Sequence, residues 1–170
     1  MSTPKIYLET TMFSFYHENR TAPSYLGLKA EVHRLFDLIK AGEYEPYTST
    51  FTTNEIEGTE NQEKRDKMWK LISDYSITVL ETSDMVERLA ALYIKEGVVS
   101  SNWTTDASHI AMTAVNGLDF IVSLNFTHIA RPWTVEHVRK VNMREGFNPI
   151  GIYKPVEVLE IYEDDTRIHE

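Results

Sequence analysis

The sequence predicts a single α/β domain with three layers, in which helices cover both faces of a central, mostly parallel sheet. Short apolar runs rich in β-branched residues alternate along the chain with segments whose apolar residues recur at helical spacing. The run DFIVS, residues 119–123, is continuously apolar from Phe120 to Val122, as expected of a central parallel strand. A chain of 170 residues, 42% of them hydrophobic, is long enough for one core, so residues 1–170 are expected to form one domain.

The first half of the chain is expected to hold strands at 5–8, 43–48 and 76–80, with helices at 25–41, 50–58 and 60–74. Gly42 is a natural stop for the first of these helices. The helix at 60–74 is highly charged, and it is expected to bury the apolar side chains that recur along it, namely Met68, Trp69, Leu71 and Ile72.

The second half is expected to continue the alternation. Helices are predicted with Ser83, Thr104 or Thr105, and Thr134 as their caps, and with Gly97, Gly117 and Gly146 as their stops. A polar loop at 98–103 is expected between the first two of these helices, and strands are predicted at 119–123 and 149–153. The residues from about 161 onward are interpreted as an acidic tail.

Four oxygen-bearing side chains are candidates for a common site. Glu9, Glu55 and Asn125 each follow a predicted strand, and Asp106 lies in the first turn of a predicted helix. Because the carboxyl ends of parallel strands open on one side of a sheet, residues distant in sequence converge there. Three carboxylates and an amide suit a hard divalent cation.

Each of these residues also has a purely structural interpretation. Asp106 could stabilise the helix dipole, and Glu55 could be a solvated helix residue. Glu9 could serve as a capping or turn residue and Asn125 as a turn former. For each residue taken alone, the structural role is the more common one. The placement of all four residues at one end of the predicted sheet favours a site.

Composition excludes several classes of function. The chain has no cysteine, so disulfides, thiolate catalysis and cysteine zinc sites are excluded, which fits a cytoplasmic location. No apolar run is long enough for a membrane span. The net charge of -9 argues against broad attraction to nucleic acid, but residues 127–144 carry Arg131, Arg139, Lys140 and Arg144 against Glu136 alone. That basic stretch is either a solvated helix face or a guide for a phosphate backbone.

Three segments together resemble the PIN-domain family, metal-dependent ribonucleases that include the toxins of many bacterial toxin–antitoxin pairs. They are IYLETTMFSF, STFTTNEIE and DASHIAMTAVNGLDFIVSLNFTHIA, and the ending NPIGIYKPVEVLE is similar to the closing strand of one PIN subgroup. The resemblance places the family's acidic cluster on Glu9, Glu55, Asp106 and Asn125. It also assigns Thr10 and Ser123 as hydroxyls that orient ligands or waters. The first acid is usually Asp and the last is often Asp, so Glu9 and Asn125 depart from the commonest pattern.

The resemblance implies hydrolysis of RNA phosphodiester bonds with Mg²⁺ or Mn²⁺ bound by the acidic cluster, which lowers the pKa of a bound water and neutralises the phosphate. Other catalytic signatures are missing from the sequence: a P-loop, a G-x-S-x-G nucleophile motif and an H-E-x-x-H zinc motif. His109, one turn after Asp106, is expected to be a packed or surface residue, and a contact with the site is the alternative.

Two other functions stay open. One is a PIN-like module that has lost activity and binds RNA or protein, which the acidic balance and the departures at Glu9 and Asn125 favour. The other is a different Mg²⁺-dependent phosphohydrolase, which is weakened because no D-x-D motif follows the first strand.

The expected partners are RNA, an antitoxin protein and a second copy of the chain. The homodimer is predicted from the apolar and aromatic side chains that follow Glu9, namely Met12, Phe13, Phe15 and Tyr16. If they complete the core instead, this argument for a dimer is lost.

Overall fold

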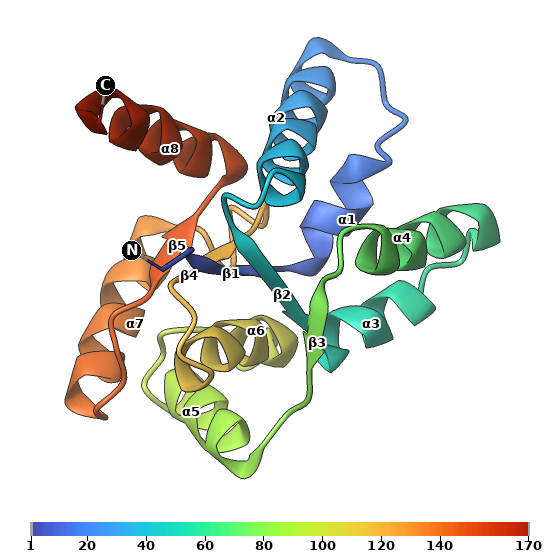
Figure 1. Ribbon diagram of the computed structural model, residues 1–170. Coiled ribbons are helices and arrows are strands. Elements are labelled where there is room, and N and C mark those ends of the chain that lie inside the picture. Colours follow the sequence, from blue (N-terminus) through green and yellow to red (C-terminus); the bar gives the residue numbers. More distant parts are fainter. Residues whose placement is uncertain (1, 170) are drawn as a thin grey trace.

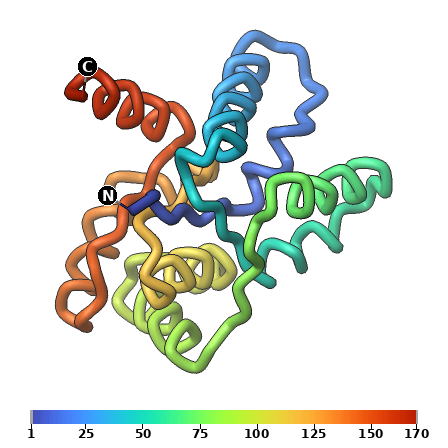
Figure 2. Tube along the Cα trace, in the orientation of Figure 1, coloured from blue at the N-terminus to red at the C-terminus, as the bar shows by residue number. Residues whose placement is uncertain are grey.

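The computed structural model describes residues 2–169 and has a sheet of five parallel strands at its centre (Figure 1). The strands are β1 (Lys5–Leu8), β2 (Glu45–Ser49), β3 (Thr78–Leu80), β4 (Phe120–Val122) and β5 (Gly151–Tyr153). Their order is β3-β2-β1-β4-β5, and every neighbouring pair is parallel. The Cα trace in Figure 2 shows the dark blue β1 in the middle of the molecule, where β2 and β4 flank it. The predicted α/β class with a parallel sheet is confirmed.

The helices lie in two layers against this sheet. Their bounds are α1 (Thr10–Tyr16), α2 (Pro23–Lys40), α3 (Thr50–Glu57), α4 (Gln62–Asp74), α5 (Asp84–Lys95), α6 (Thr104–Val115), α7 (Pro132–Arg144) and α8 (Pro155–His169). Figure 1 shows α5, α6 and α7 on one side of the strands and α2 and α8 on the other.

Alternating residues of the central strands supply two separate cores. Tyr7 and Ile121 belong to the core formed with α5, α6 and α7. Ile6 and Leu8 belong to the core formed with α1, α2, α4 and α8. Because successive strand residues point to opposite faces, a strand must be apolar along its whole length to bury both faces, which explains the continuous hydrophobicity of these short runs.

The element boundaries agree closely with the sequence in most places. The strand at 5–8 is found as predicted, Ser83 caps α5 through a bond from the Val86 amide, and the predicted stops have positive φ, 73° at Gly97 and 66° at Gly117. Glycine has no Cβ, so it adopts this left-handed conformation without strain.

Several local predictions were wrong. Residues 161–169, interpreted as a tail, continue α8, which buries Val158 and Leu159 on one face. Trp69, expected inside, is 37% exposed, and its indole donates a hydrogen bond to Glu57. The loop at 98–103, predicted to be polar, begins with two valines, and both of them are buried.

Two predicted helix caps were also wrong. The residues at the N-cap positions of α6 and α7 are Trp103 and Arg131, and neither makes a side-chain cap bond. Thr134 is instead buried and accepts a hydrogen bond from the Arg131 guanidinium.

The aromatic segment after Glu9 is absorbed by the fold. Met12 and Phe13 are fully buried in the core, and the Tyr16 ring stacks on His33 with 3.9 Å between ring centroids. These residues complete the core, so the sequence argument for a homodimer is lost and the oligomeric state stays a prediction.

Within the described part of the chain, none of the helices combines the length and apolarity needed to cross a membrane.

Candidate metal and phosphodiester site

The candidate residues gather at the carboxyl end of the sheet beside its topological switch point. From β1 the chain proceeds to β2 and β3 on one side and later to β4 and β5 on the other, so the switch point lies between β1 and β4. Glu9 follows β1 directly, and Asn125 follows β4 after two residues. Glu55 lies on α3, which begins where β2 ends, and Asp106 lies in the first turn of α6.

Glu9 is buried and held in one orientation. Its side chain is only 3% exposed and caps α1. Its Oε1 accepts hydrogen bonds from the Thr11 amide at 3.1 Å, the Thr11 hydroxyl at 2.5 Å and the Ser123 hydroxyl at 2.8 Å. Thr11 in turn accepts a bond from the Leu124 amide at 2.8 Å, which ties the start of α1 to the end of β4. All three bonds to the carboxylate fall on Oε1, so Oε2 is its candidate ligand atom.

Glu55 is paired with a buried histidine. Its Oε1 lies 2.7 Å from His109 Nε2 and accepts a bond from the Thr10 hydroxyl at 2.8 Å. The other imidazole nitrogen, Nδ1, lies 2.6 Å from the Tyr7 hydroxyl, which lies 2.6 Å from the Ser49 hydroxyl. His109 is 1% exposed and Glu55 is 42% exposed, so the pair reaches from the core to the surface.

Asp106 is held by the loop that follows β4. Its Oδ1 accepts a bond from the Asn125 side-chain amide at 3.3 Å, and its Oδ2 lies 3.0 Å from His128 Nδ1. The Asn125 backbone amide donates to the Ser123 hydroxyl at 2.9 Å, and this hydroxyl also contacts Glu9. One hydrogen-bonded network therefore joins Glu9 to Asp106, and the Glu55 pair stands beside it.

Burial and neighbouring charges shift the carboxyl groups in different directions. Burial raises the pKa of Glu9 despite the His109 charge and the hydroxyl bonds that lower it. Burial likewise raises the pKa of Asp106, and the nearby Glu55 charge adds to this effect. Burial alone would raise the pKa of Glu55, but the hydrogen bond and charge of His109 outweigh it, and the net pKa is lowered.

His109 supplies positive charge among these acids. Burial disfavours its imidazolium form, but Tyr7, Glu55 and Glu9 outweigh that cost and raise the pKa of His109 to about 10. At pH 7 the ring is therefore protonated, and both nitrogens donate hydrogen bonds. The acidic site contains its own cation before any ligand binds.

The donor set fits a divalent metal by chemistry, although the side chains do not yet converge. Carboxylate and amide oxygens are the ligands that Mg²⁺ and Mn²⁺ prefer. Among residues 2–169, however, no three His, Asp or Glu side chains lie close enough together to hold a metal ion. Each carboxylate points at a protein donor instead, so metal binding requires at least one of them to change partner.

The resemblance assigned two of the hydroxyls that bond to candidate ligands, Thr10 and Ser123, but the sequence did not indicate Thr11 or His128. Thr11, not only Thr10, orients a carboxylate, and His109 and His128 each pair with one. One sequence feature did indicate that His109 could contact the site. It lies three residues after Asp106, and residues at this spacing are neighbours on one helix face. Nothing in the sequence revealed that it would bridge Tyr7 and Glu55.

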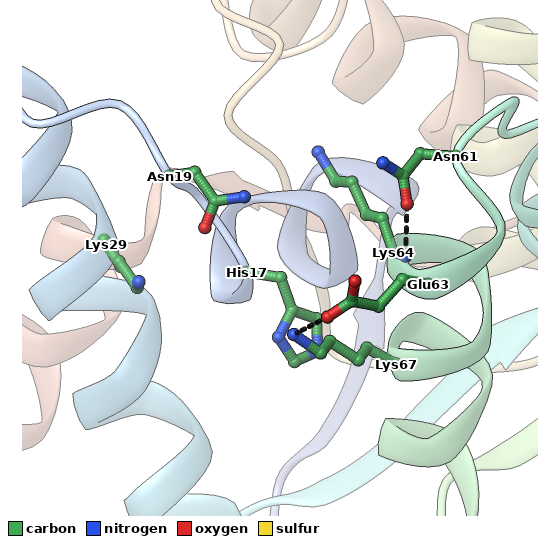
Figure 3. A pocket seen from close by; sticks show the side chains of 7 residues that line it. All are labelled: His17, Asn19, Lys29, Asn61, Glu63, Lys64 and Lys67. Carbon is green, nitrogen blue, oxygen red and sulfur yellow. Dashed lines mark hydrogen bonds and ion pairs between the residues drawn. The ribbon is translucent and has the colours of Figure 1, made fainter.

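A separate basic pocket of about 240 Å³ lies at the far end of α1, away from the candidate residues. Figure 3 shows its lining: His17, Asn19, Lys29, Asn61, Glu63, Lys64 and Lys67. Glu63 pairs with Lys67 at 3.1 Å, and Lys29 donates to the Glu18 carbonyl at 2.8 Å. Two of the three lysines are thus already engaged, and the pocket contains none of the predicted site residues.

Comparison with known proteins bears on the fold. No protein-family model matches the chain, and no curated protein matches it significantly in sequence. The chain is similar to one chain of a solved structure, the crystal structure of VapBC2 from Rickettsia felis bound to a DNA fragment from their promoter. The TM-score is 0.51 at 11% identity, over 88% of this chain and 98% of the other. The match shows that the two chains share a fold and, at that identity, shows nothing about family or activity.

Proposed function

We propose that this protein is a Mg²⁺- or Mn²⁺-dependent endoribonuclease that hydrolyses RNA phosphodiester bonds. The observation that supports this most is the gathering of Glu9, Glu55, Asp106 and Asn125 from four separate segments at the switch point of a parallel sheet. Four functionally unrelated polar residues would seldom meet there, and a helix dipole or a turn explains each residue alone but not the group.

Glu9, Glu55, Asp106 and the Asn125 side-chain oxygen would hold the metal. Glu55 is the ligand best placed to change partner, since 42% of its side chain is exposed and it lies at the open end of its histidine pair. When bound, the metal lowers the pKa of a water molecule and neutralises the phosphate and the leaving oxygen.

The remaining residues of the site position these ligands. Thr11 and Ser123 fix the Glu9 carboxylate through its Oε1, which leaves Oε2 as its candidate ligand atom. His128 and Asn125 hold the two oxygens of Asp106, and His109 anchors Glu55 to the core through Tyr7. Such partners of metal ligands reduce the freedom of the side chains and thereby increase metal affinity.

The proposal extends to a toxin role with an antitoxin protein as partner. It rests on the resemblance of the three sequence motifs to a family that includes such toxins, and the shared fold is compatible with it. The cytoplasmic location belongs to the same proposal.

One observation favours the alternative of an inactive RNA- or protein-binding module. Every candidate carboxylate already accepts a hydrogen bond from a protein group. The protonated His109 also supplies positive charge among these acids, which a bound metal ion would otherwise supply. A module of this kind would keep the network as a structural element and would neither bind metal nor cleave RNA.

Cleavage of labelled RNA separates these functions. We expect wild type to cut with Mg²⁺ or Mn²⁺ and to be inactive in EDTA, while Glu55→Gln and Glu9→Gln lose the activity. Glu57→Gln is the matched control, since Glu57 is an exposed neighbour on α3 that contacts Trp69. Absence of metal-dependent cleavage from wild type would favour the module. Turnover of small phosphate esters in place of RNA would favour the phosphohydrolase.

A further inference from the structure

Exposed aromatic rings are concentrated next to the candidate site. Three Phe and Trp side chains among residues 2–169 are highly exposed, and two of them, Phe126 at 43% and Trp133 at 54%, lie close together in sequence after β4. Phe126 directly follows the candidate ligand Asn125, and Trp133 is in the first turn of α7. The third ring, Trp69, lies on α4 and donates to Glu57.

Direct contacts connect this segment to Asp106. The His128 imidazole that contacts Asp106 also stacks on Trp103, with 3.7 Å between centroids and 17° between the ring planes. The Arg131 guanidinium lies 5.6 Å from the Trp103 ring centroid. A continuous row of rings and cations therefore runs from the acidic network to the start of α7.

Each of the two exposed rings has a basic group beside it. The Lys154 ammonium lies 5.3 Å from the Phe126 centroid, and Trp133 stacks on His137 with 3.7 Å between centroids. Lys154 and Arg139 also line a pocket of about 450 Å³ beside the first turns of α7, together with Glu136 and Glu157. In a chain of net charge -9, cations interleaved with exposed rings are a local exception.

This combination matches unpaired RNA better than it matches a protein surface. Single-stranded nucleic acids bind by stacking bases on aromatic rings while basic groups contact the intervening phosphates. A protein partner would be expected to meet a more apolar surface with fewer charges at its centre.

We propose that Phe126 and Trp133 form a stacking platform for unpaired nucleobases of the RNA that enters the site, with Arg131 and Lys154 contacting its phosphates. The inference rests on the proposed ribonuclease function and assigns the contacts with unpaired bases to these two rings of this chain. Paired bases inside a duplex present no free face to a ring, so duplex RNA does not use the platform.

Equilibrium binding of a labelled, unstructured RNA oligonucleotide in EDTA tests the platform without cleavage. Phe126→Ala and Trp133→Ala should each weaken binding roughly fivefold to a hundredfold, the range for loss of one base–ring stack. Trp133→Phe should retain much of the affinity, and Trp69→Ala should match wild type. Because both rings are exposed, the variants should melt within a few degrees of wild type, which a thermal scan verifies.

Tryptophan fluorescence gives a second reading that reports stacking itself. In a protein with Trp69 and Trp103 replaced by Phe, the single remaining Trp133 should be quenched by the RNA, and an abasic oligonucleotide of equal length should leave it unquenched. If wild type cleaves RNA but both alanine variants bind it normally, the platform is overturned and the ribonuclease stands. If wild type neither binds nor cleaves RNA, both proposals fail, and a protein becomes the occupant to seek for these rings.

Discussion

The two histidine–carboxylate pairs of the site contain the same chemical groups but lie in opposite environments. In the Glu55–His109 pair the histidine is buried and the carboxylate half-exposed, whereas in the Asp106–His128 pair the carboxylate is 17% exposed and the histidine 32% exposed. The pKa of Glu55 is lowered and that of Asp106 is raised. A carboxylate is therefore stabilised as an anion where its partner is a fixed buried cation, and it resists ionisation where burial falls on the carboxylate itself.

This difference suggests that the two histidine–carboxylate pairs have different roles. The Glu55–His109 pair is anchored in the core through Tyr7 and contributes to stability. The Asp106–His128 pair is partly solvated and adjoins Trp103 and Arg131 through ring stacking and a cation–π contact.

The largest expected effect comes from removing the buried histidine. His109→Leu leaves the Tyr7 hydroxyl with Ser49 alone and removes the partner of Glu55, so we expect a loss of about 3 kcal/mol in the free energy of unfolding by urea. Cleavage should also fall about 10- to 100-fold, since Glu55 is no longer positioned. The matched change His128→Leu should cost less than about 1 kcal/mol, because this pair is partly solvated. Equal losses for the two variants would remove the distinction between the pairs.

The pH dependence of stability should show the same asymmetry. The pKa of His109 is raised from 6.5 to about 10. The contribution of His109 to the free energy of unfolding is therefore fully present below pH 6.5 and is lost as the pH rises through 10. We expect the free energy of unfolding of wild type to fall by roughly 3 kcal/mol between pH 7 and pH 10. His109→Leu should flatten this decline, and His128→Leu should leave it unchanged. An imidazole resonance of His109 that titrates near pH 6.5 would contradict the assignment.

The smallest effect on stability should come from the basic stretch that begins before α7 and continues along it. Replacing Arg131, Arg139 and Lys140 by Glu should weaken RNA binding and reduce its salt slope by about 0.7 for each lost phosphate contact, while metal binding stays unchanged. Lys140 already pairs with Glu136 at 3.3 Å, so it should contribute least of the three. Stability should change by less than about 0.5 kcal/mol for each replacement at the exposed Arg139 and Lys140. If the salt slope is the same as in wild type, these residues are a solvated helix face.

Local sequence signals predicted much of the fold because they act over short distances. The glycine stops and the apolar strand runs depend only on residues within a few positions, and they placed Glu9 and Asn125 at strand ends correctly. The last helix was missed because its many acids suggested a solvated tail, although Val158 and Leu159 bury one face of it. Contacts such as Ser123 with Glu9, 114 residues apart, follow from the order of strands and leave no local pattern.

The same limit applies to the histidines of the site. His109 lies on a helix whose neighbours are small and apolar, so helical spacing predicts that it faces inward or is packed. Its charge depends on Tyr7 and Glu9 at the end of β1 and on Glu55 of α3, which the fold brings to it from two distant segments. A sequence pattern predicts which residues reach the site, and only the folded arrangement decides which of them are paired and charged.

The central claim, that these acids form a metal site, is tested most directly by thermal melts of wild type and Asp106→Asn, each in EDTA and in excess Mn²⁺. Because the pKa of Asp106 is raised, its ionised form costs stability at pH 7, so Asp106→Asn should melt higher than wild type in EDTA. Mn²⁺ should raise the melting temperature of wild type, and the mutant should lose most of this gain together with RNA cleavage. A purely structural role at the start of α6 predicts the opposite sign, a loss of about 0.3 to 1 kcal/mol with or without metal. A mutant that is destabilised in EDTA and still gains as much from Mn²⁺ as wild type would contradict the account.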